Sequence, residues 1–538
     1  MPVTEAKQVN QEALASFGAG HRSHQKNAVN KSNESVHGQV SLPTGTGKTR
    51  VQVHLHLEDM VKKTALGQSG VYVVAAHRLV LCRQLLMNLV DLVAEAGLPF
   101  DVLFVGSDRL DEDEIYEKHM AEDVSKKTTF VTCTTRQAEI KNAVDQAKMM
   151  GRHVLVVSTY HSLDRLRVLD AIDIVTYDEA HTIASSRQSD DNFEAHVKEL
   201  QELGIIRRQY FFTATRKVSG EEWGMNNKAI YGDLLLEVAP REMILAGEIV
   251  PPRIHRIITK DDGEFKNQTM IVKAIQGAFS FHRNAVKTSS PLSGELGAKL
   301  LVSADGTPAV QRLIDNDGFK RWCIQNKIRL FVFSSLIGTY MIGPDYVFQK
   351  ASRNKVTSEM QALPDDQDAI LLHIDILTEG IDLPSITGVM TFRELNIIKL
   401  LQTIGRASRL LGTDRKRLYG GQVKPLEFDK MVKPYAWVIF PKLSDDGSEA
   451  SLKMEDTIKK VVEAYDVPKM VFDREDEYVG APDPTLAPMT QRDETTRNDA
   501  VTELRNIVED LLIKGGDHVS VEDLDRCLRR GSDKGLLL

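Results

Sequence analysis

The stretch Leu42-Pro43-Thr44-Gly45-Thr46-Gly47-Lys48-Thr49 decides the fold of this 538-residue chain. Its glycines let the backbone curl so that successive N–H groups face a phosphate chain. Lys48 can then reach the β and γ phosphates, and the Thr49 hydroxyl can ligate Mg²⁺. Helix-like sequence follows from 51 to 62, so a helix dipole points at the same anion. The usual pattern opens with a small residue where this chain has Leu42, so only its second half matches. A nucleotide site is expected here, although kinases, GTPases, transporters and motors all share such a loop.

Short apolar runs alternate with helical stretches along most of the chain. The clearest runs are Val71–Ala76, Val154–Val157, Ile172–Tyr177, Leu330–Phe333, Ile370–Ile374 and Ala436–Phe440. This alternation is typical of α/β proteins, in which helices cover both faces of a parallel sheet. Because the pattern restarts near Leu300, we expect two α/β units in tandem.

The expected domain boundaries follow from prolines and composition. We expect residues 1–20 to form an N-terminal extension, 21–240 the first α/β domain, and 241–444 the second. Residues 445–538 are expected to be a small, mainly helical C-terminal region with a linker at 480–498. The central boundary rests on Pro251-Pro252, read as ending a helix, and the linker rests on three prolines. Apolar residues at helical spacing from 501 to 512 predict a helix that packs on the body, with partner binding as the rarer alternative.

Charge and cysteine content limit the class of protein. The formal net charge is −8, but residues 445–538 hold 13 Lys+Arg and 23 Asp+Glu, which leaves 55 basic and 53 acidic residues before them. A near-neutral body can still hold a local basic groove. The sequence contains no secretory signal and no membrane-length apolar run, so no membrane partner is expected. Four scattered cysteines favour a reducing, cytoplasmic compartment, whether nucleoid-associated or phage-infected: Cys82, Cys133, Cys323 and Cys527.

A pair of carboxylates follows an apolar run 130 residues after Lys48. In a parallel sheet, the end of such a strand lies beside the phosphate loop. There Asp178 can hold Mg²⁺, usually through water, while Glu179 can orient and deprotonate an attacking water. Alone, such a pair is more often a solvated loop. Combined with the phosphate loop, it indicates nucleotide hydrolysis.

With Ala180 and His181, these carboxylates spell a DEAH box, and residues 22 to 409 resemble the DEAH-box subset of superfamily 2 helicases and translocases. The resemblance implies two tandem RecA-like domains that use ATP and Mg²⁺. It implies an adenine-recognising role for Arg22 and Gln25, and binding of the ATP phosphates by residues 44 to 49.

Further landmarks of that family occur in the expected order within the first domain. The segments around Arg78 and Thr159 are similar to those that contact the nucleic-acid backbone. Thr213-Ala214-Thr215 takes the place of the Ser-Ala-Thr motif that links hydrolysis to domain movement, so the resemblance gives Thr213, Thr215 and His181 a coupling role.

The second unit carries two more landmarks. Leu377 to Pro384 resembles the segment that contacts both nucleic acid and ATP, which implies roles for Thr378, Gly380 and Asp382. Gln402 to Arg409 matches the arginine-finger motif. Arg406 and Arg409 are therefore expected on one helical face, completing the catalytic set of Lys48, Asp178 and Glu179, with Gln402 at the nucleotide.

Two segments narrow the subgroup. Residues 242–252 resemble the domain-joining segment of restriction-enzyme motor subunits and related phage and bacterial DNA helicases, and residues 158–166 resemble those motors as well. The expected function is therefore that of an ATP-dependent DNA helicase or double-strand DNA translocase. An RNA helicase of the DEAH type is one alternative. Another is an ATP-gated nucleic-acid clamp or partner-activated switch, with the acidic C-terminal region as a docking element for a protein partner. About twenty residues precede Arg22, too few for a fused nuclease domain, so no nuclease activity is expected in this chain.

Overall fold

The computed structural model describes residues 3–106, 131–185, 192–219, 223–259, 268–304, 306–334, 336–374, 385–392, 395, 397–443, 449–465 and 476–479. Contacts divide the chain into two compact units, of which the first holds Met1–Val467 and Val471–Val479. The second unit lies outside the described residues. Across the described ranges, every helix is too short or too polar to cross a membrane.

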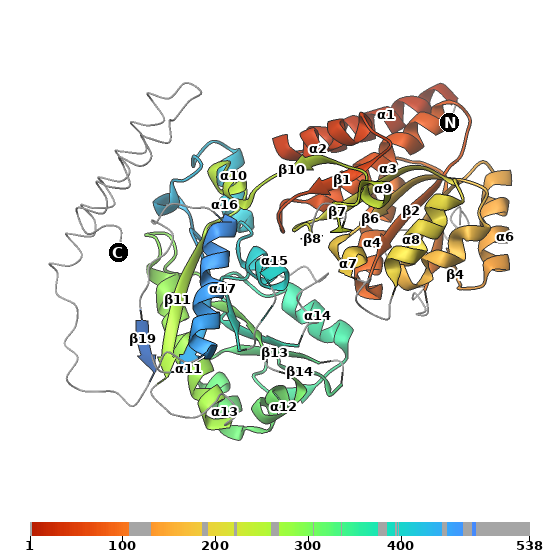
Figure 1. The fold of residues 1–538 in the computed structure, drawn as a ribbon. Helices are drawn as coiled ribbons and strands as arrows, with labels where there is room; N and C mark the ends of the chain where they lie inside the picture. Colours follow the sequence, from red (N-terminus) through yellow and green to blue (C-terminus); the bar gives the residue numbers. More distant parts are fainter. Residues whose placement is uncertain are drawn as a thin grey trace, which may run out of the picture. The chain divides into compact units, whose positions relative to one another are not determined.

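The first sheet has eight strands, and every neighbouring pair in it is parallel (Figure 1). Its spatial order is β10-β1-β7-β6-β2-β5-β3-β4, so the phosphate-loop strand β1 lies near one edge. The strands are β1 (His37–Ser41), β2 (Val71–Ala76), β3 (Phe100–Val105), β4 (Val131–Cys133), β5 (His153–Thr159), β6 (Ile172–Tyr177), β7 (Ile206–Thr213) and β10 (Asp233–Glu237). A separate two-stranded pair is formed by β8 (Val218–Ser219) and β9 (Trp223–Gly224).

Helices cover both faces of this sheet, because alternate residues of a strand point to opposite sides. Tyr72 and Val74 of β2 enter the core built with α3 and α4, whereas Val71 and Val73 enter the core built with α6, η2 and α8. The helices are α1 (Val3–Ala19), α2 (Ser23–Asn33), α3 (Lys48–Ala65), α4 (Leu79–Glu95), α6 (Gln137–Met149), η2 (Tyr160–Val168), α7 (His181–Ser185), α8 (Phe193–Glu202) and α9 (Lys228–Tyr231).

The second sheet has nine strands in the order β15-β14-β13-β16-β12-β17-β18-β11-β19. Only the pairs β13–β14 and β14–β15 are antiparallel within it. The strands are β11 (Pro252–Thr259), β12 (Lys299–Ser303), β13 (Arg329–Ser334), β14 (Gly338–Ile342), β15 (Phe348–Lys350), β16 (Ala369–His373), β17 (Gly388–Thr391), β18 (Ala436–Leu443) and β19 (Asp476–Val479).

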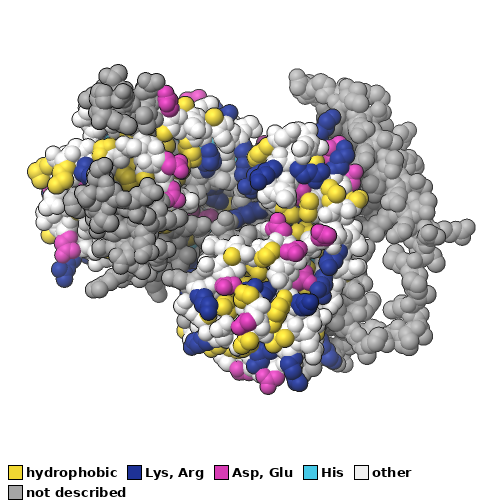
Figure 2. Space-filling model, turned by 180° about the vertical axis from the view of Figure 1, so that it is seen from behind, with side chains coloured by type: hydrophobic (Ala, Val, Ile, Leu, Met, Phe, Trp, Pro, Cys, Tyr) yellow, Lys and Arg dark blue, Asp and Glu magenta, His cyan; other side chains and the backbone are white. Residues whose placement is uncertain are grey.

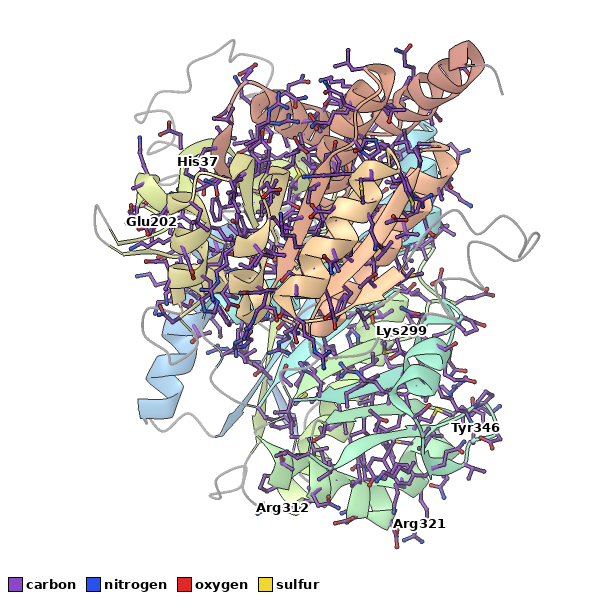
Figure 3. All side chains as sticks on the ribbon, turned by 90° about the vertical axis from the view of Figure 1, so that its right-hand side faces the viewer. His37, Glu202, Lys299, Arg312, Arg321 and Tyr346 are labelled. Atoms are coloured by element: carbon purple, nitrogen blue, oxygen red, sulfur yellow. The ribbon has the colours of Figure 1, made fainter. Side chains whose placement is uncertain are left out.

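Two sets of helices sandwich the second sheet. Leu300 and Val302 of β12 pack with α11, α12 and α13, whereas Leu301 packs in the core that includes α14, α15 and α17. Figure 3 labels Arg312 and Arg321 on the outward sides of α12 and α13, whereas Lys299, at the start of β12, is fully buried. The helices are α10 (Pro240–Leu245), α11 (Gln268–Thr288), α12 (Thr307–Asp315), α13 (Asp317–Gln325), α14 (Arg353–Gln361), α15 (Ile397–Ala407), α16 (Gly412–Tyr419), η4 (Phe428–Lys430) and α17 (Glu449–Tyr465).

The α/β class and the paired sheets are confirmed, since each quoted apolar run coincides with or largely lies in a strand. One local prediction is wrong: Pro251-Pro252 does not end a helix. Helix α10 starts at Pro240 and ends at Leu245, and Pro252 is the first residue of β11. The predicted linker at 480–498 and helix at 501–512 lie outside the described residues.

Charged side chains of both signs are mixed on the face drawn in Figure 2, where Lys and Arg lie among Asp, Glu and uncharged groups. This distribution agrees with the near-neutral composition of the chain before residue 445.

Candidate nucleotide site

The phosphate loop connects β1 to α3, as the sequence predicts. Gly45 and Gly47 have φ angles of 85° and 88°, in the region that disfavours residues with a side chain. A Cβ on Gly47 would lie 2.3 Å from Gln25 Nε2, and one on Gly45 would lie 2.8 Å from Arg409 Cγ. Both positions therefore require glycine for backbone conformation and for space.

Two side chains of α2 form hydrogen bonds with the backbone of this loop. His24 Nε2 and Gln25 Nε2 both lie 2.8 Å from the carbonyl oxygen of Thr46, and Gln25 Oε1 accepts the backbone N–H of Arg22. Burial lowers the pKa of His24, which favours a neutral imidazole. Because a carbonyl can only accept, Nε2 carries the ring proton. Gln25 was predicted from its motif position, whereas His24, the residue directly before it, was not.

Arg22 makes a second connection, to the segment that follows α10. Its Nη1 lies 3.0 Å from Glu248 Oε2, and the Tyr419 hydroxyl donates to the same carboxylate at 2.9 Å. Glu248 lies in the segment 242–252 singled out above but was not itself predicted as a site residue, and Tyr419 belongs to no recognised motif. Their participation depends on the tertiary fold, since Glu248 is more than 200 residues from Arg22 in the chain.

Asp178 follows β6 directly and is only 5% exposed. Burial raises its pKa to about 6, with a further increase from Glu179, while Lys48 and a hydrogen bond from Gln52 oppose the shift. That hydrogen bond, from Gln52 Nε2 to Asp178 Oδ1, is 2.7 Å long. Gln52 was missed, although its position one helical turn after Lys48, on the same face of α3, was a signal for it.

Glu179 is contacted by side chains from both halves of the fold. Its φ angle of 51° is in the left-handed region, an unfavourable conformation that commonly occurs at functional sites. Lys48 Nζ lies 3.7 Å from Glu179 Oε1, and Gln402 Nε2 donates to Oε2 at 3.3 Å. His181 Nδ1 is 3.5 Å from the same Oε2. The structure thus groups three predicted residues, Lys48, Gln402 and His181, around the carboxylate of a fourth, Glu179.

His181 also contacts the segment that ends β7. Its Nδ1 lies 3.1 Å from Thr213 Oγ1, and that hydroxyl donates to the carbonyl of Thr215 at 2.9 Å. A hydroxyl that donates there must accept from His181, so Nδ1 carries the ring proton. A continuous polar chain therefore runs from Glu179 through His181 to Thr213.

Helix α15, which packs on the second sheet, and the residues just after it also reach the phosphate loop. A Cβ on Gly405 would lie 2.5 Å from Thr44 Cβ, so this helix runs directly beside the phosphate loop. Arg406 is buried in the last turn of α15. Arg409 lies beyond the helix end and forms an antiparallel bridge with Ile249. The expectation that both arginines share one helical face is therefore wrong, because the helix stops before Arg409.

The predicted nucleic-acid contacts are placed unevenly. Arg78 lies two residues after the end of β2, and Thr159 is the last residue of β5. Because β2 and β5 pair in parallel, both residues lie at the carboxyl edge of the first sheet. The Thr159 hydroxyl donates to Ser162 Oγ at 3.2 Å. Burial and the charge of Arg78 lower the pKa of Arg353 at the start of α14, which identifies Arg353 as a missed neighbour. The remaining predictions in the second sheet, Thr378, Gly380 and Asp382, lie outside the described residues.

The arrangement fits a nucleotide and its metal ion. Gly45 and Gly47 hold the loop in the left-handed backbone region, and helix α3 begins directly after it at Lys48, so the positive end of the helix dipole faces the loop. Gln402 is 2% exposed, and its Oε1 has no hydrogen-bond partner among the described atoms. The Thr49 hydroxyl and the Asp178 carboxylate are hard oxygen donors of the kind that Mg²⁺ prefers.

Part of the first domain is similar to a known sequence family. Residues 19–217 match the family described as "Type III restriction enzyme, res subunit". None of the curated proteins matches the chain.

Solved structures match over most of the chain. One is the ATP-dependent Type ISP restriction-modification enzyme LlaBIII bound to DNA, at 15% identity and a TM-score of 0.56. The match covers 87% of this chain but only 31% of that enzyme, so the chain spans about a third of its length. Another is the DEAD-box helicase Mss116 bound to ssRNA and UDP-BeF, at 12% identity and a TM-score of 0.50, covering 86% of this chain and 75% of that one.

The fold is thereby defined: the two sheets are RecA-like, as in the helicase Mss116, and this is the fold that the sequence resemblance implied. More particularly, residues 19–217 are similar to the restriction-enzyme family named above.

Proposed function

We propose that this protein is an ATP-dependent DNA helicase or double-strand DNA translocase. The observation that carries the proposal is the convergence of Lys48 and Gln402 on Glu179. Lys48 lies on α3, which packs on the first sheet, and Gln402 lies on α15, which packs on the second. A kinase or GTPase has no need for a second sheet at its nucleotide, whereas a motor uses one to convert hydrolysis into domain movement.

In this proposal each side chain has a defined task in ATP hydrolysis. Glu179 orients and deprotonates the attacking water, and Gln402 Oε1 accepts a hydrogen bond from that water. Lys48 exchanges its contact with Glu179 for the β and γ phosphates when ATP binds. Asp178 and Thr49 would hold Mg²⁺, which would neutralise phosphate charge.

Arg406 and Arg409 complete the proposed site from the second sheet. Their guanidinium groups stabilise the charge that develops on the γ phosphate, and this contribution exists only while α15 lies against the phosphate loop. The polar chain from Glu179 to Thr213 offers a route by which loss of the γ phosphate reaches the end of β7. Adenine recognition is assigned to Arg22 and Gln25, as the family resemblance implies.

DNA is the proposed track for two reasons. Residues 19–217 are similar to a restriction-enzyme family, and one structural relative was solved with DNA. We assign backbone contacts to Arg78, Thr159 and Thr378, because such motors bind mainly phosphates at strand ends. RNA is the second candidate, since the relative Mss116 was solved with single-stranded RNA.

The test is the steady-state ATPase rate with no nucleic acid, single-stranded DNA, duplex DNA, branched DNA and RNA. Each is measured at two salt concentrations, since phosphate contacts weaken as salt rises. Stimulation by a DNA form supports the proposal and identifies the track. Stimulation by RNA alone would replace DNA with RNA. Failure of every nucleic acid to stimulate ATPase would overturn the motor assignment.

Two variants test the assigned chemistry. Lys48→Ala and Glu179→Gln should each reduce ATP turnover by about a hundredfold or more while leaving the fold intact. Their matched controls are Lys62→Ala, on the same helix with its side chain 62% exposed, and Glu202→Gln, at the exposed end of α8. Normal turnover in either site variant would contradict the mechanism.

A further inference from the structure

A buried lysine outside every recognised motif holds the end of the arginine-finger segment. Lys433 is 1% exposed, and its Nζ donates to the carbonyl oxygens of Ala407 at 2.5 Å and Arg409 at 2.6 Å. These two carbonyls lie at and just beyond the C-terminus of α15, where a helix has no internal donors left. A cation there also complements the helix dipole.

Asp414 fixes the backbone that carries this lysine. It is 1% exposed on α16, and its two carboxylate oxygens accept the N–H groups of Val432 and Lys433, each at 2.8 Å. The side chain of Lys433 therefore starts from a backbone with little freedom. Such a bidentate carboxylate contact is stronger than a neutral hydrogen bond.

The carbonyl oxygen of Ser408, which lies between Ala407 and Arg409 in the chain, also accepts a hydrogen bond. Val250 N–H donates to Ser408 O at 2.8 Å, in the bridge that pairs Ile249 with Arg409. Three consecutive carbonyls, from Ala407 to Arg409, thus have donors from elsewhere in the chain. This holds the backbone of Arg409 in one place, and its side-chain stem then passes the phosphate loop at Gly45.

We propose that Lys433, held by Asp414, is a positioning residue for Arg409 in ATP hydrolysis. In this proposal Lys433 acts through the backbone and not on the nucleotide itself: it orders the segment from which the guanidinium of Arg409 reaches the γ phosphate. The inference rests on the proposed function, because it assigns Lys433 a role in that reaction.

The chemistry of the site supports a specific role over simple packing. The pKa of Lys433 is lowered to about 7, mainly by burial. The charges of Arg409 and Lys299 also lower this pKa, whereas those of Asp414 and Asp365 raise it. A methionine of similar length would fill the same space without this desolvation cost. What the lysine adds is two directed hydrogen bonds to the finger segment.

The test is a double-mutant cycle with Lys433→Met and Arg409→Ala, read as kcat and KM for ATP. Lys433→Met should lower kcat by about tenfold to a hundredfold, a part of what loss of an arginine finger costs. The KM for ATP should change by less than about threefold, because the phosphate loop binds the ground state. In the Arg409→Ala background the same change should lower kcat by less than about threefold, since residues that act as one unit are not additive.

The controls separate positioning from folding. Lys430→Met removes an exposed lysine three residues earlier, whose Nζ contacts Glu427, and should behave as the wild type. Asp414→Asn is a second way to disturb Lys433 and should give a smaller kcat defect with the same non-additivity. Each variant is checked by thermal unfolding and by the affinity for a fluorescent ADP analogue, which a positioning role leaves unchanged.

The outcomes are distinguishable from failure of the proposed function. A wild type without ATPase overturns the proposed function and this inference together. An active wild type in which Lys433→Met costs the same factor with and without Arg409 overturns only the inference. If both Lys433→Met and Asp414→Asn are unfolded at 25 °C, the role is structural and the inference is also overturned.

Discussion

Replacing Asp178 with asparagine should stabilise the protein without nucleotide and at the same time abolish its ATP turnover. The carboxylate is almost fully buried beside Glu179, and its pKa is raised from 3.8 to about 6. Asparagine has nearly the same shape, and its Oδ1 can keep the hydrogen bond from Gln52. The substitution therefore removes a costly buried charge while preserving the packing.

The size of the effect follows from the raised pKa. An acid with a raised pKa holds its proton more tightly in the folded state, so its ionisation destabilises the fold as pH rises from about 4 to about 6. A shift of about two pKa units corresponds to about 3 kcal/mol at pH 8. At pH 5 the same linkage gives about half of that value, because Asp178 is then mostly protonated in the folded protein. The neutral asparagine escapes this loss at both pH values.

The assay is urea or thermal unfolding followed by circular dichroism at pH 5 and pH 8, without nucleotide or Mg²⁺. Asp178→Asn should raise the free energy of unfolding by about 3 kcal/mol at pH 8 and by clearly less at pH 5. The control is Asp170→Asn, whose side chain is 73% exposed and paired with Lys141, and it should change stability by less than about 0.5 kcal/mol. Equal gains at the two pH values, or a loss at pH 8, would refute the reasoning.

Two more predictions concern the same site. Gly47→Ala should weaken binding of a fluorescent ADP analogue at least about tenfold, because its Cβ would lie 2.3 Å from Gln25 Nε2. Gly294→Ala, where a Cβ meets no atom within 4 Å, should not change that affinity. Gln52→Leu removes a hydrogen bond that lowers the pKa of Asp178, so the acid limb of kcat/KM for ATP should move to higher pH from about 6. An acid limb at an unchanged pH would show that another group controls it.

The sheets could be predicted from the sequence because strands buried on both faces are short runs of β-branched and apolar residues. Val71–Ala76 is both the predicted run and the observed β2. The prolines at 251–252 misled because proline can begin a strand as well as end a helix. The end of α15 was misplaced for a related reason: Arg406 and Arg409 fit helical spacing, but Arg409 pairs with Ile249 instead.

The residues missed in the site act through contacts between distant parts of the chain. Gln52 reaches Asp178 across 126 positions, and Lys433 reaches Ala407 and Arg409 across 26 and 24. Neither has a motif of its own. Hydrogen bonds of this kind are specified by where the chain brings a donor, which local patterns do not record.

The sequence by itself determined the α/β class, the phosphate loop and the residue types offered to a nucleotide, because these depend on local spacing and on apolar runs. Only the tertiary structure decided which side chains meet. It brought Gln402 of α15 to Glu179, and it raised the pKa of Asp178 to about 6 by burying the carboxylate. It also placed Lys433 where its side chain donates to the carbonyl of Ala407. The physical reason is that burial and directed hydrogen bonds depend on distances in space, and the packing of two sheets sets those distances.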